Sequence, residues 1–274
     1  MKLLVTNDDG IDSVFLHELV VALKQAGHEL YVVAPACEQS WTGASKTRNR
    51  SVKSAAVDRG FGCPTWTVDG TPSDCVNIAL AHLIPNASGA SPEQSRPSGS
   101  VEGVVSGINV GFNCTLAFII ASGTVAGGWE GALHGLPAIA FSQDISEEVY
   151  VHLKDNAGEP DGELRRTLQV SAAHAARLTG ELLPTIAPKS FTIHNVNFPF
   201  PCRPDTEVKR TVPSHFFMPG LFSPADDDGT HRLLWTDGKD VSPPGLVTDL
   251  GTVSAQHISH SILDYRRLGG ELPA

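Results

Sequence analysis

The first 35 residues alternate strand, helix and strand signals, and this pattern constrains the fold more than any other feature of the chain. Residues 2–6 (KLLVT) form a short apolar run that is typical of a buried strand. The next segment places apolar side chains on one helix face, at Leu16, Leu19, Val20 and Leu23. Residues 29–35 (ELYVVAP) are again strand-like. A strand–helix–strand unit of this length predicts parallel strands joined by a right-handed crossover, so we expect an α/β fold with a mostly parallel sheet.

The same reading of periodicity places further elements along the chain. Strands are expected at 65–69, 101–106, 137–141 and 190–198, and helices at 72–83, 125–134 and 164–175. Thr71, Pro72 and Asp74 have the spacing of a capped helix start. The stretch from 107 to 124 reads as a Gly, Asn and Ser-rich connection with an apolar interruption at 116–121.

Composition predicts one domain of 274 residues, with a core of about 1–200 and a C-terminal extension of about 201–274. Pro, Gly and turn residues dominate the extension, which predicts short extended pieces and a β-hairpin. The Ser, Pro and Gly-rich residues 86–100 predict a flexible surface insertion. The triple-Asp turn at 226–229 is expected to be exposed.

The charge and the cysteine pattern exclude several classes of partner. A net charge of −10 argues against binding a nucleic-acid backbone, which requires a basic face. The five cysteines are scattered without a CxxC pair, so a disulfide framework is not expected. The chain shows no signal peptide and no apolar run of transmembrane length. We therefore expect a cytoplasmic protein with no membrane partner.

Asn7, Asp8, Asp9 and Gly10 follow the first predicted strand directly. In α/β proteins ligands collect outside the carboxyl ends of the strands. Two adjacent carboxylates at such a position repel each other unless a cation lies between them, and Mg²⁺ commonly binds one or two carboxylates together with a substrate phosphate. The motif therefore predicts a metal site for a phosphorylated substrate, with an Asp-rich β-turn as the alternative.

Two further polar segments follow predicted strands, at Gln39–Ser40 and at 107–113. Loops after successive parallel strands converge on one edge of the sheet, which would bring together carboxylate, hydroxyl and amide oxygens suited to Mg²⁺ or Mn²⁺ rather than zinc. Residues 122–124 (SGT) precede a predicted helix, and a helix start is an anion-binding site. A tight turn at 107–111 and a plain helix cap at Ser122 are the alternatives, but the joint pattern favours hydrolysis of a phosphomonoester.

Other constellations carry less weight. His257 and His260 lie three residues apart without a third ligand at a known spacing, so we interpret them as structural histidines. The chain contains no GxGxxG after a strand, no GxxxxGK[ST] and no GxSxG, which argues against dinucleotide, P-loop nucleotide and serine-hydrolase chemistry.

Seven short stretches along the first 200 residues carry a resemblance to a known family. They are TNDDGI (6–11), VVAPACEQSWTG (32–43), VDGTPSDCVNIAL (68–80), SGINVGFN (106–113), SGTVAGGWEG (122–131), GLPAIAFS (135–142) and HNVNFP (194–199). In this order they resemble the SurE family, the survival-protein 5′/3′-nucleotidases. Ala121 departs from that pattern, which has Tyr before SGT.

The resemblance implies a Rossmann-like α/β core and a phosphoric monoester hydrolase that acts on nucleoside monophosphates. It further implies one divalent metal ion (Mg²⁺ or Mn²⁺) per subunit, and a homodimer or homotetramer held partly by exchanged C-terminal segments. The implied metal ligands are Asp8, Asp9, Ser40 and Asn109, of which Asp8, Asp9 and Asn109 are also the implied catalytic residues. The implied phosphate-binding residues are Asn7, Asn113, Ser122, Gly123 and Thr124.

Two alternatives to a nucleotidase remain open from the sequence. One is a metal-dependent phosphatase for another phosphoester, such as polyphosphate or a specialised metabolite, and the altered residues around Ala121 motivate it. The other is a non-catalytic metal-binding assembly module that has kept the fold. The sequence also leaves open whether water attacks the phosphorus directly or Asp8 attacks first.

Overall fold

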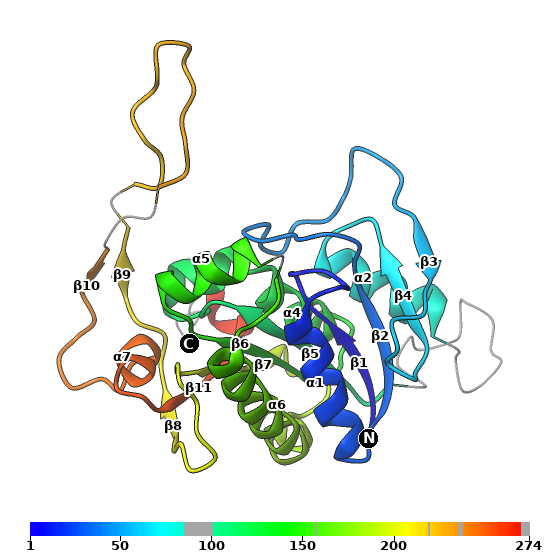
Figure 1. Cartoon of the computed structure of the whole chain (residues 1–274). Helices are drawn as coiled ribbons and strands as arrows, with labels where there is room; N and C mark the ends of the chain where they lie inside the picture. Colours follow the sequence, from blue (N-terminus) through cyan, green and yellow to red (C-terminus); the bar gives the residue numbers. More distant parts are fainter. Residues whose placement is uncertain (85–100, 157, 219, 235–237, 270–274) are drawn as a thin grey trace.

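One mixed sheet of nine strands organises the chain (Figure 1). The computed structural model describes residues 1–84, 101–156, 158–218, 220–234 and 238–269, so the expected insertion at 86–100 lies outside the described residues. The strand order is β3-β4-β2-β1-β5-β6-β7-β11-β8. The parallel part comprises β4 (Thr65–Val68), β2 (Glu29–Pro35), β1 (Lys2–Thr6), β5 (Gly103–Val110), β6 (Ala138–Gln143) and β7 (Thr192–Phe198). The expected α/β fold with a mostly parallel sheet is confirmed.

Three further strands complete the two edges of the sheet. β3 (Ser54–Ala56) pairs antiparallel with β4, and β11 (Ile258–Asp264) pairs antiparallel with β7. β8 (Val208–Thr211) then pairs parallel with β11. Segments beyond residue 200 therefore belong to the same sheet as the N-terminal strands.

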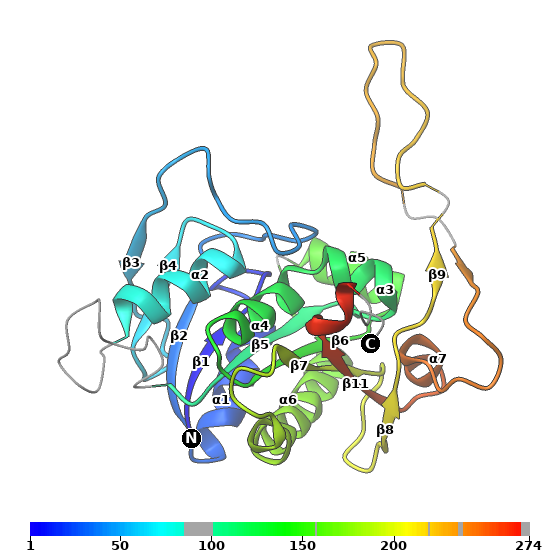
Figure 2. The same ribbon diagram turned by 180° about the vertical axis from the view of Figure 1, so that it is seen from behind.

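Helices cover both faces of the sheet, as the two views show (Figures 1 and 2). α1 (Val14–Gln25) and α6 (Gly162–Leu182) pack on one face, while α2 (Pro72–Ile78) and α4 (Gly123–Leu133) pack on the other. The shorter helical elements are η1 (Ala79–Leu83), α3 (Thr115–Ala121), α5 (Glu147–Asp155), η2 (Leu183–Thr185), α7 (Asp249–Ser254) and η3 (Tyr265–Gly269). The predicted capping box at the start of α2 is confirmed, because the Thr71 side chain accepts from Asp74 N–H and the Asp74 side chain accepts from Thr71 N–H.

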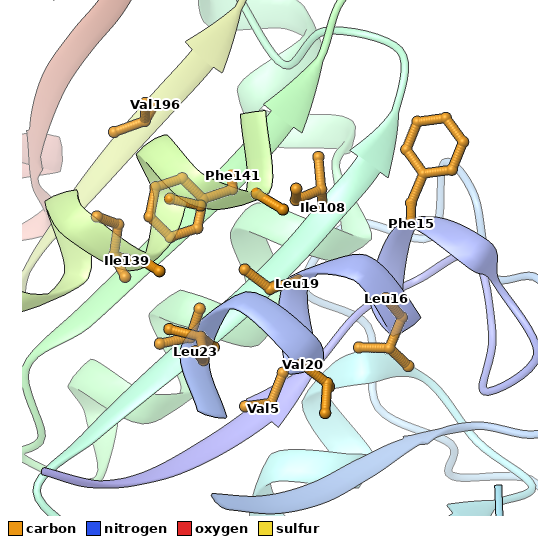
Figure 3. Close-up of a cluster of buried hydrophobic side chains, with 14 of the residues drawn as sticks. Val5, Phe15, Leu16, Leu19, Val20, Leu23, Ile108, Ile139, Phe141 and Val196 are labelled. Carbon is orange, nitrogen blue, oxygen red and sulfur yellow. The ribbon is translucent and has the colours of Figure 1, made fainter. Parts of the chain in front are cut away.

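Side chains of β1 alternate between two apolar cores, as expected for a strand buried on both faces. Val5 lies with Leu16, Leu19 and Val20 of α1 in the cluster drawn in Figure 3, whereas Leu4 belongs to the cluster under α2 and α4. Burial on both faces holds the carboxyl end of β1 rigidly, and the polar residues 7–10 begin there.

A two-stranded arm projects from the body of the molecule (Figures 1 and 2). Its base is the antiparallel pair of β9 (Phe216–Phe217) and β10 (Lys239–Asp240), and a bridge between Phe222 and Leu233 lies further along it. This confirms the predicted C-terminal hairpin. The triple-Asp turn at 226–229 lies exposed beyond the Phe222–Leu233 bridge, as predicted.

The expectation of an irregular connection from 107 to 124 was wrong. Gly107–Val110 continues strand β5, because Asn109 and Val110 pair with Ser142 and Gln143 of β6 across a register shift. The apolar interruption at 116–121 lies in helix α3. No single helix in the described ranges is long and apolar enough to cross a membrane; α3 and α4 meet these criteria only as a pair bent by 69°.

Candidate active site

The carboxyl ends of β1 and β5 and the first turn of α4 meet at one point. Asp8, directly after β1, is buried, with 3% of its surface exposed. The Thr124 hydroxyl of α4 donates a short hydrogen bond to Asp8 Oδ1, and the same hydroxyl oxygen lies 3.3 Å from Asn109 Oδ1. The structure thus brings together three residues that the sequence analysis singled out, from three separate segments of the chain.

Asp9 and Asn109 are oriented by the backbone at the end of β5. Val110 N–H donates to Asp9 Oδ2 over 3.1 Å. The Asn109 side-chain amide donates to the carbonyl oxygens of Val110 and Gly111, at 3.1 and 2.6 Å. These two bonds occupy the nitrogen of Asn109, so its oxygen faces Thr124 and is available as a neutral ligand.

The pKa values of Asp8 and Asp9 are both raised. Burial raises the pKa of Asp8 to about 6, against hydrogen bonds from Thr124 that lower it. Burial and the neighbouring charge of Asp8 raise the pKa of Asp9 well above its usual range. In the part of the chain that the structure describes, no Lys, Arg or His side chain forms an ion pair with either carboxylate. A bound cation would relieve the cost of holding both charges in this position.

The donor set fits a hard divalent cation. Asp8, Asp9 and Asn109 supply only oxygen atoms, which suits Mg²⁺ or Mn²⁺ better than a softer metal. Within the described ranges, no group of three or more His, Cys, Asp and Glu side chains could hold a metal ion. The oxygens beyond the two Asp carboxylates must therefore come from neutral residues, from substrate or from water.

Helix α4 begins against Asp8 because residue 123 lacks a side chain. A Cβ at Gly123 would lie 2.8 Å from Asp8 Cβ, 2.9 Å from Asp8 Oδ2 and 3.2 Å from Gln39 O. Ser122, 5% exposed, caps the helix by accepting from Val125 N–H at 3.0 Å. The positive end of the α4 dipole and its first backbone N–H groups therefore adjoin the carboxylate pair, which is an arrangement suited to an anion next to a metal ion.

The loop of residues 36–53, which follows β2, lies beside the same point. Gln39 N–H donates to the backbone oxygen of Asp8 over 2.7 Å, which places the backbone of the next residue, Ser40, near the acid pair. The Ser40 side chain is exposed and its hydroxyl donates to Glu38 Oε1 at 2.7 Å. The structure therefore places the Ser40 backbone near Asp8 and leaves its hydroxyl on Glu38, without a hydrogen bond to Asp8, Asp9 or Asn109 among the described contacts.

Two of the predicted phosphate-site residues are held by internal hydrogen bonds. The Asn7 side chain donates to Gly10 O at 2.8 Å, while its Oδ1 is buried and has no hydrogen-bond partner among the described residues. Asn113 N–H donates to Asn197 Oδ1 at 2.7 Å, and the Asn113 side-chain amide donates to Ser142 Oγ at 2.8 Å. Asn113 is thus fixed against the ends of β6 and β7.

Sequence reasoning assigned no individual role to three residues that shape this region, Asn195, Asn197 and Asp249. Asn195 Nδ2 donates to Asn113 O at 2.8 Å, so β7 holds the segment after β5 through its two asparagines. Asp249 accepts from Thr115 N–H at 2.8 Å and from Ser214 N–H at 2.9 Å, and so joins α3 to the C-terminal region. The sequence signal for the two asparagines of β7 was the Asn-x-Asn pattern at the end of a predicted strand. No sequence pattern indicated a role for Asp249.

Comparison with known proteins places this architecture. The family model described as "Survival protein SurE" matches residues 3–216. The relative named "5'-nucleotidase SurE 1" from Thermus thermophilus is 34% identical over 263 residues, covering 94% of this chain and 90% of the relative. The "5'-nucleotidase SurE" of Desulforudis audaxviator is 32% identical over 262 residues, with the same two coverages.

A solved structure agrees with the sequence relatives. The crystal structure of the SurE protein from Aquifex aeolicus superposes with a TM-score of 0.66 at 26% identity, covering 98% of this chain and 97% of that one. Fold and site together define an α/β protein with an oxygen-lined acidic site at a helix start. The chain belongs to the SurE family, which confirms the resemblance seen in the sequence.

Proposed function

We propose that this protein is a divalent-metal-dependent phosphomonoesterase that hydrolyses nucleoside monophosphates to nucleoside and phosphate. The observation that carries the proposal is the pair of carboxylates, Asp8 and Asp9, set beside the Asn109 oxygen and the start of α4. Two relatives that cover nearly the whole chain are named 5'-nucleotidases, which supports the same substrate class.

We assign one Mg²⁺ or Mn²⁺ ion per subunit to Asp8, Asp9 and Asn109, with Ser40 as the fourth protein ligand. When bound, the ion supplies positive charge that polarises the phosphoryl group and activates a water molecule. The Thr124 hydroxyl orients Asp8 through their hydrogen bond, and Val110 N–H orients Asp9. Ser40 joins the set by turning its hydroxyl away from Glu38, which its exposed position permits.

The residues at the start of α4 would bind the phosphate. The backbone N–H groups of Gly123 and Thr124 and the Ser122 hydroxyl can donate to phosphate oxygens, and the helix dipole favours the negative charge. Asn7 and Asn113 complete the proposed set of donors. Each side-chain amide donates one N–H inside the protein, to Gly10 O and to Ser142 Oγ respectively, and has a second N–H that can donate to phosphate. Fixed donors of this kind stabilise the equatorial oxygens of a phosphoryl transition state without reorganisation.

The exposed arm supports an oligomer, which we propose to be a homodimer or a homotetramer with exchanged C-terminal segments. Phe217 and Phe222 of the arm are 69% and 66% exposed, an exposure that a partner subunit would relieve.

We propose 1–274 as a single structural unit, because β8 and β11 pair within the main sheet. The cytoplasm is the proposed compartment, since all five cysteines are free thiols in the described chain.

Phosphate release tests the proposal. Purified protein is incubated with AMP, GMP, their 3′ isomers and p-nitrophenyl phosphate, each with Mg²⁺, with Mn²⁺ and with EDTA. We expect release from nucleotides that requires the metal and is abolished by EDTA. Release from p-nitrophenyl phosphate alone would move the substrate to another ester, and no release from folded, metal-supplied protein would refute the assignment of an enzyme.

A further inference from the structure

An aromatic cluster lies beside the acidic site and has no part in the chemistry described so far. The Trp41 and Phe118 rings meet edge to face, with centroids 5.6 Å apart and an interplanar angle of 72°. Phe118 meets Phe112 in the same manner, at 5.3 Å and 83°. Phe118 is buried, whereas Trp41 is 44% exposed. The cluster therefore fixes the Trp41 indole from one side and leaves part of its surface open.

Chain connections place the cluster at the rim of the site. Trp41 follows Ser40, and Gln39 N–H is bonded to Asp8 O at 2.7 Å. Gly43 N–H donates to Ala121 O at 2.9 Å, immediately before the Ser122 cap. Since consecutive Cα atoms are about 3.8 Å apart, Trp41 lies within two residues of both contacts. The backbone at Trp41 is thus tied on one side to Asp8 and on the other to the residue before Ser122.

The backbone at Trp41 is held in an unusual conformation. Its φ of 63° lies in the left-handed region, which is uncommon for a bulky side chain. Thr42 Oγ1 donates to Gln39 O at 2.8 Å across this turn, and a Cβ at Gly43 would lie 2.9 Å from Ile120 O. The fold therefore holds a large, partly exposed aromatic residue in a strained backbone conformation at the rim of the site. Strained residues of this kind cluster at ligand sites.

We propose that the exposed part of the Trp41 indole is the stacking surface for a planar ring on the leaving group of the phosphomonoester, with Phe118 and Phe112 holding the indole in place. The proposal rests on the proposed function and deepens it, because it assigns substrates whose alcohol carries an aromatic ring, such as a nucleobase. A stacked base makes contact without hydrogen-bond readout, so the surface accepts different bases.

The matched substrates AMP and ribose 5-phosphate isolate the ring, because they share the same phosphate ester and differ by the base. In wild type, kcat/KM for AMP should exceed that for ribose 5-phosphate. Trp41→Ala should lower the ratio of the two values by about 5- to 150-fold, through KM for AMP, which is the range measured for one stacked base. Trp41→Phe retains a ring and should restore most of the ratio.

Phe191→Ala is the matched control. Phe191 is also a partly exposed aromatic residue with a left-handed backbone, at 39% exposure and φ 54°, but it precedes β7 at the opposite end of the strand from Asn197. The ratio of kcat/KM for AMP to kcat/KM for ribose 5-phosphate in Phe191→Ala should equal that of wild type. Should Trp41→Ala fail to fold by circular dichroism, Trp41→Leu, which keeps apolar bulk without a ring, replaces it.

Adenosine binding in EDTA separates this inference from the proposed function. Adenosine has no phosphate, so its binding, measured by saturation-transfer NMR, reports the ring surface without turnover or metal. Binding to wild type that is lost in Trp41→Ala supports the inference even when no phosphate is released from any substrate. An unchanged AMP to ribose 5-phosphate ratio together with equal adenosine binding in Trp41→Ala overturns it, and that is the outcome expected if Trp41 is instead covered by another subunit.

Discussion

Replacement of Glu130 by glutamine tests how firmly the loop that carries Ser40 is held against the core. Glu130 lies on α4 with its side chain 5% exposed, and its Oε2 accepts from Lys46 Nζ at 2.7 Å. Asn77 Nδ2 donates to its Oε1 at 3.0 Å, and His134 Nε2 lies 3.4 Å from the same oxygen. Lys46 belongs to the loop of residues 36–53, so this buried carboxylate fixes the loop to the helix that begins the phosphate site.

The magnitude follows from the acidity of Glu130. Burial alone would raise its pKa, but hydrogen bonds from His134, Lys46 and Asn77 outweigh burial and lower the pKa from 4.5 to about 2. A difference of about 2.5 between the two pKa values corresponds to roughly 3 kcal/mol in favour of the carboxylate. Lys46 is 49% exposed, so solvent screens part of this. We expect Glu130→Gln to reduce the free energy of unfolding by about 1–3 kcal/mol at pH 7.

The lowered pKa of Glu130 determines how this stabilisation changes with pH. Because the folded-state pKa is lowered, the stabilisation is complete above pH 4.5 and is lost as the pH falls toward 2. Urea denaturation of wild type and Glu130→Gln should therefore show a difference that shrinks by roughly half between pH 5 and pH 3. Glu181→Gln, which removes an exposed ion pair with Arg177 on α6, is the control and should change stability by less than about 0.5 kcal/mol. Equal stability of Glu130→Gln and wild type at pH 7 would refute the reasoning.

Three further predictions follow from other contacts. Gly123→Ala should lower kcat by about 10- to 100-fold in a phosphate-release assay, because the added Cβ would displace Asp8. Gly128→Ala on the same helix is the control and should leave kcat near wild type, since its Cβ would lie 3.6 Å from Ile193 Cδ1. Equal rates for the two variants would contradict the site geometry. Burial lowers the pKa of His194 to about 4 and that of His260 to about 3, and the rings are hydrogen-bonded at 2.7 Å. Both histidines are protonated in the unfolded chain below pH 6.5 but stay neutral in the native state, so they destabilise the fold as the pH falls from 6.5 to 4. His260→Leu should therefore reduce the slope of the unfolding free energy against pH in that window. An unchanged slope would contradict this prediction. Phe217→Ser should convert the proposed oligomer to a smaller species in sedimentation velocity. Leu268→Ser, which alters a similarly exposed apolar residue in η3, should not, and an unaltered mass for Phe217→Ser would show that the arm does not join subunits.

The parts of the fold that sequence predicted are those fixed by local periodicity. The apolar run of β1 and the helical spacing of α1 are local patterns, and the capping box at Thr71 and Asp74 is a local hydrogen-bonded motif. Each is determined by side chains within a few residues of one another, so the chain itself displays them. The convergence of Asp8 and Asn109 at one edge follows from the parallel order of β1 and β5.

Features that depend on distant partners were not visible in the sequence. Helix α3 begins at Thr115, whose N–H is bonded to Asp249, 134 residues later in the chain. The strand continuation at Gly107–Val110 depends on pairing with β6 across a register shift. No local pattern reports such contacts. The roles of Asp8, Asp9, Ser40 and Asn109 as metal ligands stay predictions, because contacts within the protein do not test the binding of an ion.

Binding of Mn²⁺ to wild type and to Asp8→Asn tests the central claim most directly. Titration followed by electron paramagnetic resonance counts bound ions, and phosphate release from AMP is measured on the same samples. The site predicts about one ion per subunit in wild type, and weakened Mn²⁺ binding with loss of turnover in folded Asp8→Asn. Unchanged Mn²⁺ binding and near-normal turnover in Asp8→Asn would contradict the account.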